Sequence, residues 1–244
     1  MHEKLYSMKR ELAGMIKNDR LLKSAVREVN KMDMIKASLI VRNSRHQSLN
    51  IDKILEGELA KDVPVKDYVF IENFCDLVRV GFNCLEMGNY LDRNLLISGY
   101  RILSDNDKAT FRKNNPVVYA FNHVPAYSAD IEEKLDDALR RVYSIEAGNN
   151  VILKAMYIHN KIIDIYPFQE FSAELAIYAM NYYLMEQGIT PINMPIERDQ
   201  YLALVSDCLK GQRQEEFYNF LCAAVYDKME GTVEACKEYL KNNQ

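Results

Sequence analysis

The residues best suited to chemistry lie in one short loop in the second half of the chain, at Tyr166, Glu170 and Glu174. Carboxylate oxygens bind hard divalent cations, so Glu170 and Glu174 together are a candidate pair of metal ligands. A phenol has a pKa near ~10, which makes Tyr166 a poor general base at neutral pH. Each residue also has a plainer interpretation. Glu170 would be a solvated loop carboxylate, and Tyr166 a packed aromatic side chain with a hydrogen-bonded hydroxyl.

Two apolar helices are predicted to position this loop. The first ends at Tyr166, because Pro167 disfavours helical geometry in the residue before it. Ser172 is the expected N-cap of the second helix, and Gly188 is expected to end it. The first helix has a buried stripe at Ile158, Ile162, Ile163 and Ile165, and the second at Leu175, Tyr178, Ala179, Tyr182 and Tyr183.

This helix–loop–helix resembles the signature of the Fic family, H-x-F-x-(D/E)-G-N-G-R-x-x-R. Members of that family move a nucleotide part, usually AMP, onto a protein hydroxyl. In this register Tyr166 replaces the His, while Phe168 and Glu170 match the Phe and the acidic position. The Gly-Asn-Gly-Arg segment and the last Arg are replaced by Phe171, Ser172, Ala173, Glu174 and Ile177.

Two neighbouring features support the resemblance. Many family members carry a second His seven residues before the motif His, and His159 lies at that place. A long apolar helix and a G-x-x-P turn at Gly188 follow the motif, as in the family. We expect His159 to make a structural hydrogen bond. His123 has no acid or Cys near it in sequence that would make it a catalytic partner.

The substitutions remove the chemistry that the resemblance implies. AMP transfer needs a general base, a divalent metal and an anion cradle at a helix N-terminus. Loss of the His lowers the rate by ~10²–10⁴-fold. Phe171 and Ala173 place side chains where glycines would let amides approach phosphate, and Glu174 would repel it. No P-loop or G-x-G-x-x-G motif offers another nucleotide site.

The family's flap has a counterpart near residues 111–125. Phe111-Arg112 and Val124-Pro125 resemble its two ends. The β-branched and aromatic residues between them predict a small β-hairpin. In the family the flap pairs with the backbone of a substrate protein. The expected flap residues here are Val117, Val118, Tyr119 and Phe121.

The predicted fold is mainly α, a Fic-like helical bundle with this hairpin. An N-terminal helical arm (1–43) precedes a core (44–225) and a C-terminal helix extension (226–244). Many family members have S-x-x-x-E-G-N near the arm, where the Glu closes the active site by pairing with the last motif Arg. The equivalent region was expected at 41–49, and it contains no Glu. Helices are expected at 5–16, 21–41 (capped by Asp19), 51–59, 68–87, 91–103, 131–147, 198–209 and 215–239.

Composition limits the remaining functions. The 244 residues are 48% hydrophobic with a net charge of −4, so a well-packed domain is expected and a nucleic-acid partner is not. No apolar run reaches membrane-spanning length, and residues 1–4 do not open a signal peptide. The five cysteines form no C-x-x-C pair and indicate free thiols in a reducing cytoplasm, or in a host cell after delivery.

Two functional hypotheses follow. The first is a degenerate Fic-fold protein without AMP transfer, which needs no cofactor. It would bind another protein through the flap and the vacated groove near Tyr166 and Glu170. The alternative is a transferase of this fold that uses non-standard residues, with Mg and ATP or another nucleotide-derived donor. The sequence does not indicate the oligomeric state.

Overall fold

The structure is a computed structural model that describes residues 2–42, 54, 57, 64–144 and 148–243. The described part of the chain is almost entirely helical, which confirms the mainly α fold class. Its longer helices are α1 (His2–Lys17), α2 (Arg20–Ser38), α4 (Val65–Glu86), α5 (Arg93–Ser104), α6 (Ile131–Tyr143), α7 (Val151–Ile165), α8 (Ser172–Glu186), α9 (Arg198–Leu209) and α10 (Gln214–Asn242). The expected helix at 51–59 lies outside the described residues, apart from Ile54 and Gly57.

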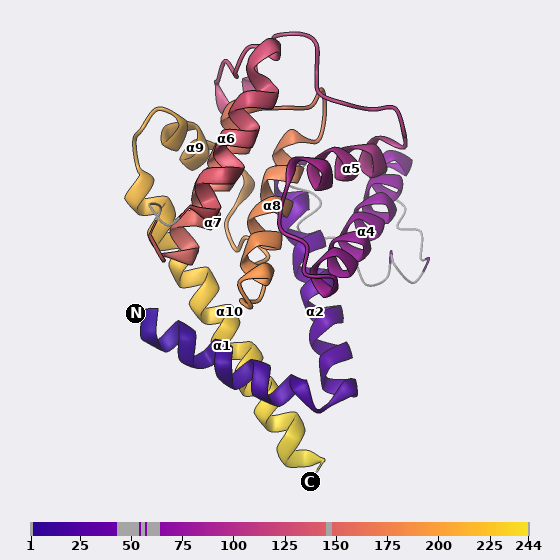
Figure 1. Cartoon of the computed structure of the whole chain (residues 1–244), viewed down its shortest axis with the longest axis vertical. Helices are drawn as coiled ribbons and strands as arrows, with labels where there is room; N and C mark the ends of the chain where they lie inside the picture. The colour runs from indigo at the N-terminus through magenta and orange to yellow at the C-terminus, as the bar shows by residue number, and fades with distance from the viewer. Residues whose placement is uncertain (1, 43–53, 55–56, 58–63, 145–147, 244) are drawn as a thin grey trace.

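Helix α8 lies at the centre of the bundle (Figure 1). It runs beside α7 and also packs against α2, α4 and α5. Every residue from Ser172 to Leu184 is buried. A helix that is apolar on all sides is typical of such a central position. The motif loop, which connects α7 to α8, is therefore held between two core helices.

Close packing of α4 on α8 depends on a glycine. A Cβ atom at Gly81 would lie 2.4 Å from the hydroxyl oxygen of Tyr178. Tyr178 is fully buried, and no described residue is a hydrogen-bond partner of that hydroxyl. The absence of a side chain at Gly81 thus lets the two helices approach.

The N-terminal and C-terminal helices join the bundle from below. Helix α1 crosses α10 at the foot of the molecule, and α2 rises from there and ends beside α8 (Figure 1). Asp19 caps α2 as expected, because its side chain accepts the amide N–H of Leu22 at 2.8 Å. A buried ion pair of 2.5 Å between Asp33 and Lys228 joins α2 to α10. The boundary expected after residue 225 lies inside α10, which is continuous.

The predicted β-hairpin is reduced to a single antiparallel bridge in the described residues. Val118 and His123 exchange backbone hydrogen bonds of 2.9 and 3.2 Å. The short helix η3 (Tyr119–Phe121) fills the turn between them. Another short helix, η4 (Ser128–Asp130), leads into α6. The flap is thus an irregular segment that runs between α5 and α6 at the top of Figure 1.

No helix in the described part of the chain is both long and apolar enough to cross a membrane. The prediction of free thiols agrees with the structure, in which all five cysteines are unpaired.

Candidate functional site

Two residues in left-handed backbone conformation shape the motif loop. Tyr166 ends α7 with φ 49°, and its amide donates to the carbonyl of Ile162 at 2.8 Å. Phe171 precedes α8 with φ 62°. Glycine adopts this conformation most readily, and a bulky residue there is strained. The backbone at Phe171 therefore has the shape suited to the glycine of the motif, although the side chain is aromatic.

The expectation that Ser172 caps α8 is wrong. The helix begins at Ser172 itself, with Phe171 as the N-cap residue. The Ser172 hydroxyl donates to the carbonyl of Phe168 at 3.1 Å and accepts its amide N–H at 2.9 Å. This serine therefore closes the motif loop on Phe168 and leaves the first turn of α8 to other partners.

Phe168 anchors the loop in the core. It is fully buried, and its ring stacks on that of Tyr100 with centroids 4.5 Å apart. Phe111, at one end of the flap, packs against the same ring at 5.6 Å. The one aromatic position that matches the motif is thus a structural contact between loop, flap and α5.

Arg112 fastens the flap to the C-terminus of α7. Its side chain is buried and donates to the carbonyls of Ile165 (3.0 Å), Tyr166 (2.7 Å) and Ala126. Its backbone amide donates to Pro167 O at 3.0 Å. A cation at a helix C-terminus also interacts favourably with the helix dipole.

An ion pair also holds the flap. Nε2 of His123 lies 3.2 Å from Oδ1 of Asp164. Its hydrogen bond to Asp164 raises the pKa of His123, and the same bond lowers the pKa of Asp164 to about 2. Lys161 contacts the other Asp164 oxygen at 3.0 Å. His123 is therefore a flap anchor, and the acid that it pairs with comes from α7.

The four expected flap residues divide into two kinds. Val118 and Phe121 are buried, and Phe121 packs edge-on against Tyr201. Val117 and Tyr119 are exposed, at 49% and 88% of their surface. Only the second pair is available to another molecule.

Tyr166 is unsuited to act as a base. Burial raises the pKa of its phenol to about 12, and the nearby carboxylates of Glu174 and Glu170 contribute. His159, about two helical turns before Tyr166, is fully buried and contacts the Tyr201 hydroxyl at 2.8 Å and Asn160 Oδ1 at 2.9 Å. Burial lowers the pKa of His159 to about 4. The expected structural hydrogen bond of His159 is confirmed.

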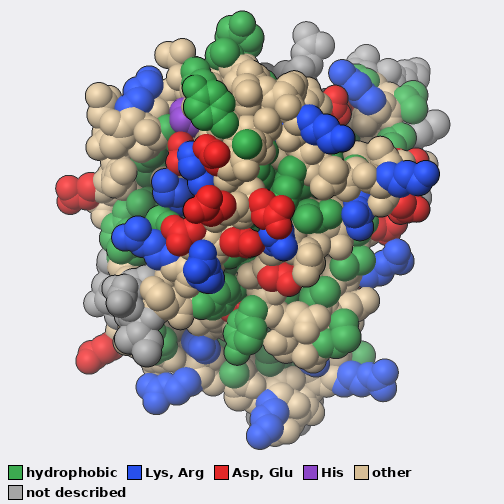
Figure 2. Space-filling view, turned by 45° about the horizontal axis from the view of Figure 1, so that its top comes forward, with side chains coloured by type: hydrophobic (Ala, Val, Ile, Leu, Met, Phe, Trp, Pro, Cys, Tyr) green, Lys and Arg blue, Asp and Glu red, His purple; other side chains and the backbone are tan. Residues whose placement is uncertain are grey.

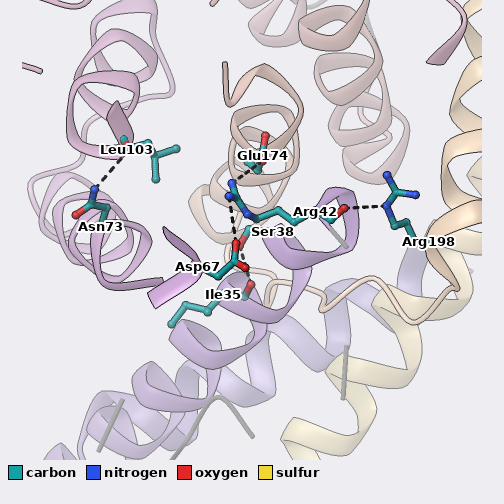
Figure 3. A network of polar contacts seen from close by, with 8 residues as sticks. All are labelled: Ile35, Ser38, Arg42, Asp67, Asn73, Leu103, Glu174 and Arg198. Carbon is teal, nitrogen blue, oxygen red and sulfur yellow. Dashed lines mark hydrogen bonds and ion pairs between the residues drawn. The ribbon is translucent and has the colours of Figure 1, made fainter. Parts of the chain in front are cut away.

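The central feature of the site is a charged cluster at the N-terminus of α8 (Figure 3). Arg42 extends between Glu174 and Asp67, with a nitrogen 3.4 Å from a carboxylate oxygen of each. Asp67 and Glu174 are buried, and the Arg42 side chain is 19% exposed. The guanidinium carbon lies 4.0 Å above the Phe70 ring and 5.8 Å from that of Phe171. We call Arg42, Asp67, Glu174, Phe70 and Phe171 the Arg42 cluster.

Burial raises the pKa of Glu174 against the opposing effects of its own backbone hydrogen bond and of Arg42. Arg42 Nε has no acceptor among the described residues. On its other side the Arg42 carbonyl accepts a hydrogen bond of 3.0 Å from Arg198, which ties α9 to the cluster. One buried cation thus serves two buried carboxylates.

Arg42 was missed by the sequence analysis, which asked only whether residues 41–49 contain a Glu. A register signal was present, because Ser38 precedes Arg42 by four positions, as Ser precedes Glu in S-x-x-x-E-G-N. In that motif the helical arm contributes an acid that pairs with a motif arginine. Here Arg42 pairs instead with Glu174 of α8, which stands at the first motif arginine position, while the last one is Ile177.

The remaining motif positions do not form an open cradle. Ala173 is 5% exposed, and Ile177 is fully buried in the core of α8. Glu170 is exposed on the loop. The described residues contain no group of three or more His, Cys, Asp or Glu side chains that could hold a metal ion. The structure thus brings Tyr166, Glu170 and Glu174 into one neighbourhood and leaves Glu170 as the one exposed carboxylate among them.

The fold is that of Fic domain proteins. A Fic domain containing signaling protein from Bacteroides thetaiotaomicron matches with a TM-score of 0.75 and 15% identity, over 97% of this chain and 96% of that one. Fic-1 (residues 134–508) from C. elegans matches with a TM-score of 0.72 and 15% identity, over 97% and 72%. A Fic family protein from Desulfovibrio desulfuricans G20 matches with a TM-score of 0.54 and 13% identity, over 98% and 74%.

Identities this low show the shared fold and leave activity open. No protein-family model and no curated protein matches the sequence.

The Arg42 cluster yields a prediction about stability. Arg42→Met keeps the apolar contact with Phe70 but removes the cation that pairs with Glu174. We expect the free energy of unfolding at pH 7 to fall by about 3 kcal/mol, because the buried Glu174 carboxylate loses that partner. Adding Glu174→Gln should restore part of the loss, and Arg79→Met, at an exposed pair with Asp76, is the control. Urea unfolding gives the free energy of unfolding of the natural chain and of the three variants. An Arg42→Met protein as stable as the Arg79→Met control contradicts the prediction.

The stability that Glu174 contributes to the folded protein changes with pH in a defined direction. An acid whose folded pKa is raised stabilises the protein at low pH, and this contribution is lost as pH rises from the ordinary value of 4.5 through the folded pKa. Replacing Glu174 by Gln should therefore flatten that decrease. A decrease of equal size in Glu174→Gln would assign the effect to another carboxyl group.

The flap gives a further prediction about pH, which concerns the base His123 in place of an acid. The raised pKa of His123 means that its contribution is complete below the unfolded value of about 6.5 and is lost as pH rises through the folded pKa. The contribution of Asp164 is complete above its ordinary pKa of 3.8 and is lost as pH falls from there to about 2, so it does not change between pH 6 and pH 8. We expect the flap amides of Val118 and Ala126 to exchange hydrogen faster at pH 8 than at pH 6 after correction for intrinsic rates. His123→Gln should abolish the difference, and its persistence there would contradict the prediction.

Proposed function

We propose that this chain is a Fic-fold protein that does not transfer AMP and acts by binding another protein. The observation that supports this most is the Arg42 cluster. A carboxylate, Glu174, stands at the buried N-terminus of α8 and is neutralised from within the chain by Arg42. The resemblance to the Fic family predicts a phosphate site at this helix N-terminus. In this chain an internal ion pair occupies that position.

Electrostatics opposes a nucleotide at this position. Two like charges ~4 Å apart interact by about 4 kcal/mol at an effective dielectric of ~20. A phosphate at this position would lie beside the carboxylates of Glu174 and Asp67, which already pair with the guanidinium of Arg42. The phenyl rings of Phe70 and Phe171, whose centroids are 5.9 Å apart, occupy the adjoining space.

The proton-transfer step is also unsupported. With a pKa of about 12, the Tyr166 phenol stays protonated at neutral pH and cannot accept a proton from a target hydroxyl. His123 and His159 are engaged with Asp164 and Tyr201.

The flap supplies the surface for a partner. Tyr119 is 88% exposed, and Val117, Val124 and Tyr127 beside it are also exposed. Exposed aromatic and aliphatic side chains gathered on one segment are typical of protein interfaces. Figure 2 shows acidic and basic side chains mixed on the face brought forward there, with hydrophobic side chains among them. A protein fits this mixed surface better than a nucleic acid does.

The alternative is a transferase of the same fold with another donor. The exposed Glu170 carboxylate supports it, since it lies on the motif loop and could hold Mg with one phosphate. The two proposals differ in whether any nucleotide-derived donor binds.

A titration of Mg-ATP by calorimetry separates them. We expect no binding heat up to about 1 mM ATP, because net negative charge and bulk face the phosphates. The positive control restores the motif with Tyr166→His, Phe171→Gly, Ser172→Asn, Ala173→Gly and Glu174→Arg. It also carries Arg42→Glu, since the native Arg42 would repel the new arginine. Micromolar binding by the natural chain, or a mass increment with any donor of a nucleotide and nucleotide-sugar panel, contradicts the proposal.

Protein binding is tested by photo-crosslinking in the source cells. Benzoylphenylalanine in place of Tyr119 should form a discrete protein adduct. The same residue in place of Met87, which is 69% exposed at the far end of α4, is the control. Adding Val124→Asp to the Tyr119 probe should reduce the adduct by about tenfold, since it places a charge in the apolar contact. Equal adducts from both probe positions, or none, would count against a flap partner.

A further inference from the structure

The exposed side of the flap is built from two short segments joined by a backbone bridge. Val118 and His123 exchange hydrogen bonds of 2.9 and 3.2 Å, so the residues on either side of this pair lie next to one another. Val118 is buried, and His123 contacts Asp164 of α7. The apolar side chains left exposed on the two segments form a surface that we call the flap patch: Val117, Tyr119, Val124 and Tyr127.

The sequence that carries the flap patch is free of acids. Residues 108–129 contain no Asp or Glu, although 35 of the 244 residues in the whole chain are acidic. The same segment has basic residues at Lys108, Arg112, Lys113 and His123. The flap is therefore locally basic in a chain whose net charge is −4. A local charge of this sign favours a partner of negative charge.

Some of these basic groups are already engaged within the chain. Arg112 is buried and donates to backbone carbonyls at the end of α7. His123 and Lys161 both contact the Asp164 carboxylate, at 3.2 and 3.0 Å. The acid that α7 places against the flap is thus balanced by two basic side chains.

Two further acids lie at the margins of the flap. Asp130 pairs with Lys134 at 3.6 Å. Glu170 is exposed on the motif loop, which contacts the flap through the rings of Phe168 and Phe111. These acids border the flap patch without belonging to the segment that carries it.

Lys113 supplies an unpaired cation at the edge of the flap patch. Its side chain is exposed and has no ion-pair partner in the described part of the chain. Asn115, two residues further on, accepts the amide N–H of Ser128 at 2.8 Å, which holds this end of the segment beside Tyr127. Lys108 is exposed as well, but it follows Asp107 directly in the sequence.

We propose that the flap patch binds an acidic segment of a partner protein, whose apolar side chains cover the patch and whose carboxylate pairs with Lys113. This inference rests on the protein-binding function proposed above and adds the chemistry of the partner. Nucleic acids and anionic membranes are bound by clusters of several basic side chains. The flap offers only Lys108 and Lys113 as unpaired cations among the described residues, beside four apolar side chains. An apolar segment with one or two carboxylates matches that arrangement.

A library of random dodecapeptides displayed on phage tests this with the full chain. Peptides are selected on the natural chain after removal of those that also bind a Tyr119→Ser, Val124→Ser double variant. We expect the remaining peptides to combine aromatic or aliphatic residues with a net negative charge. Methyl NMR of Val117 and Val124 then reports whether a synthetic copy of a selected peptide binds at the flap patch.

Charge reversal at Lys113 tests the proposed ion pair. Lys113→Glu should weaken the binding of the selected peptides by about tenfold, because it turns an attraction into a repulsion. Lys241→Glu makes the same change of net charge in the last turn of α10, at the end of the molecule opposite to the flap (Figure 1). It should leave the affinity unchanged. Fluorescence anisotropy of labelled peptides measures both, and the affinity for the natural chain should fall as salt is raised.

The outcomes separate this inference from the proposed function. Neutral or basic peptides that shift the Val117 and Val124 methyl signals would overturn the inference and leave the flap as a protein-binding surface. Equal affinities of Lys113→Glu and Lys241→Glu would overturn it too, as would tighter binding of a single-stranded oligonucleotide or of phosphatidylglycerol vesicles at the same methyl groups. If no peptide shifts these signals, the inference is also wrong, and the crosslink at Tyr119 then decides the proposed function alone.

Discussion

The guanidinium of Arg42 pairs with two carboxylates that the fold has removed from water, and it joins α4 to α8 at the N-terminus of α8. Asp67 enters from α4 and Glu174 from α8, while the carbonyl of Arg42 itself receives Arg198 from α9 (Figure 3). A buried ion pair adds little net stability, but removing one member leaves a charge that the interior cannot solvate. The segment after α2 therefore has to bring a cation to this point.

The same cluster accounts for the electrostatics at the N-terminus of α8 in this Fic-like fold. A helix N-terminus attracts negative charge because its first amides have no partners within the helix. In this chain Glu174 supplies that charge from within the helix, and Arg42 balances it from the arm. The region thus satisfies its own electrostatics without an outside anion. The flap is held independently, since Arg112 binds backbone carbonyls at the end of α7, which any side chains at the motif positions would leave in place.

Local patterns in the sequence predicted most of the helices. The expected helix 198–209 coincides with α9, and Asp19 was identified as a cap, because periodicity and capping depend on residues near one another. The conformation of the flap was harder to predict from the sequence. Its β-branched residues favour a strand, but in the structure only Val118 and His123 pair, and Arg112 and Phe121 hold the segment through side-chain contacts instead.

The ion pair between Arg42 and Glu174 joins residues 132 positions apart, and no local pattern encodes such a contact. The sequence analysis recognised that Glu174 would repel phosphate but not what would balance it. The sequence contained one indication, because Arg42 occupies the position at which the S-x-x-x-E-G-N pattern has its Glu. The general reason is physical: a buried carboxylate needs a cation nearby, or its charge is left without a partner. Glu174 at an arginine position therefore implies a cation nearby, and the residue four positions after Ser38 is that cation.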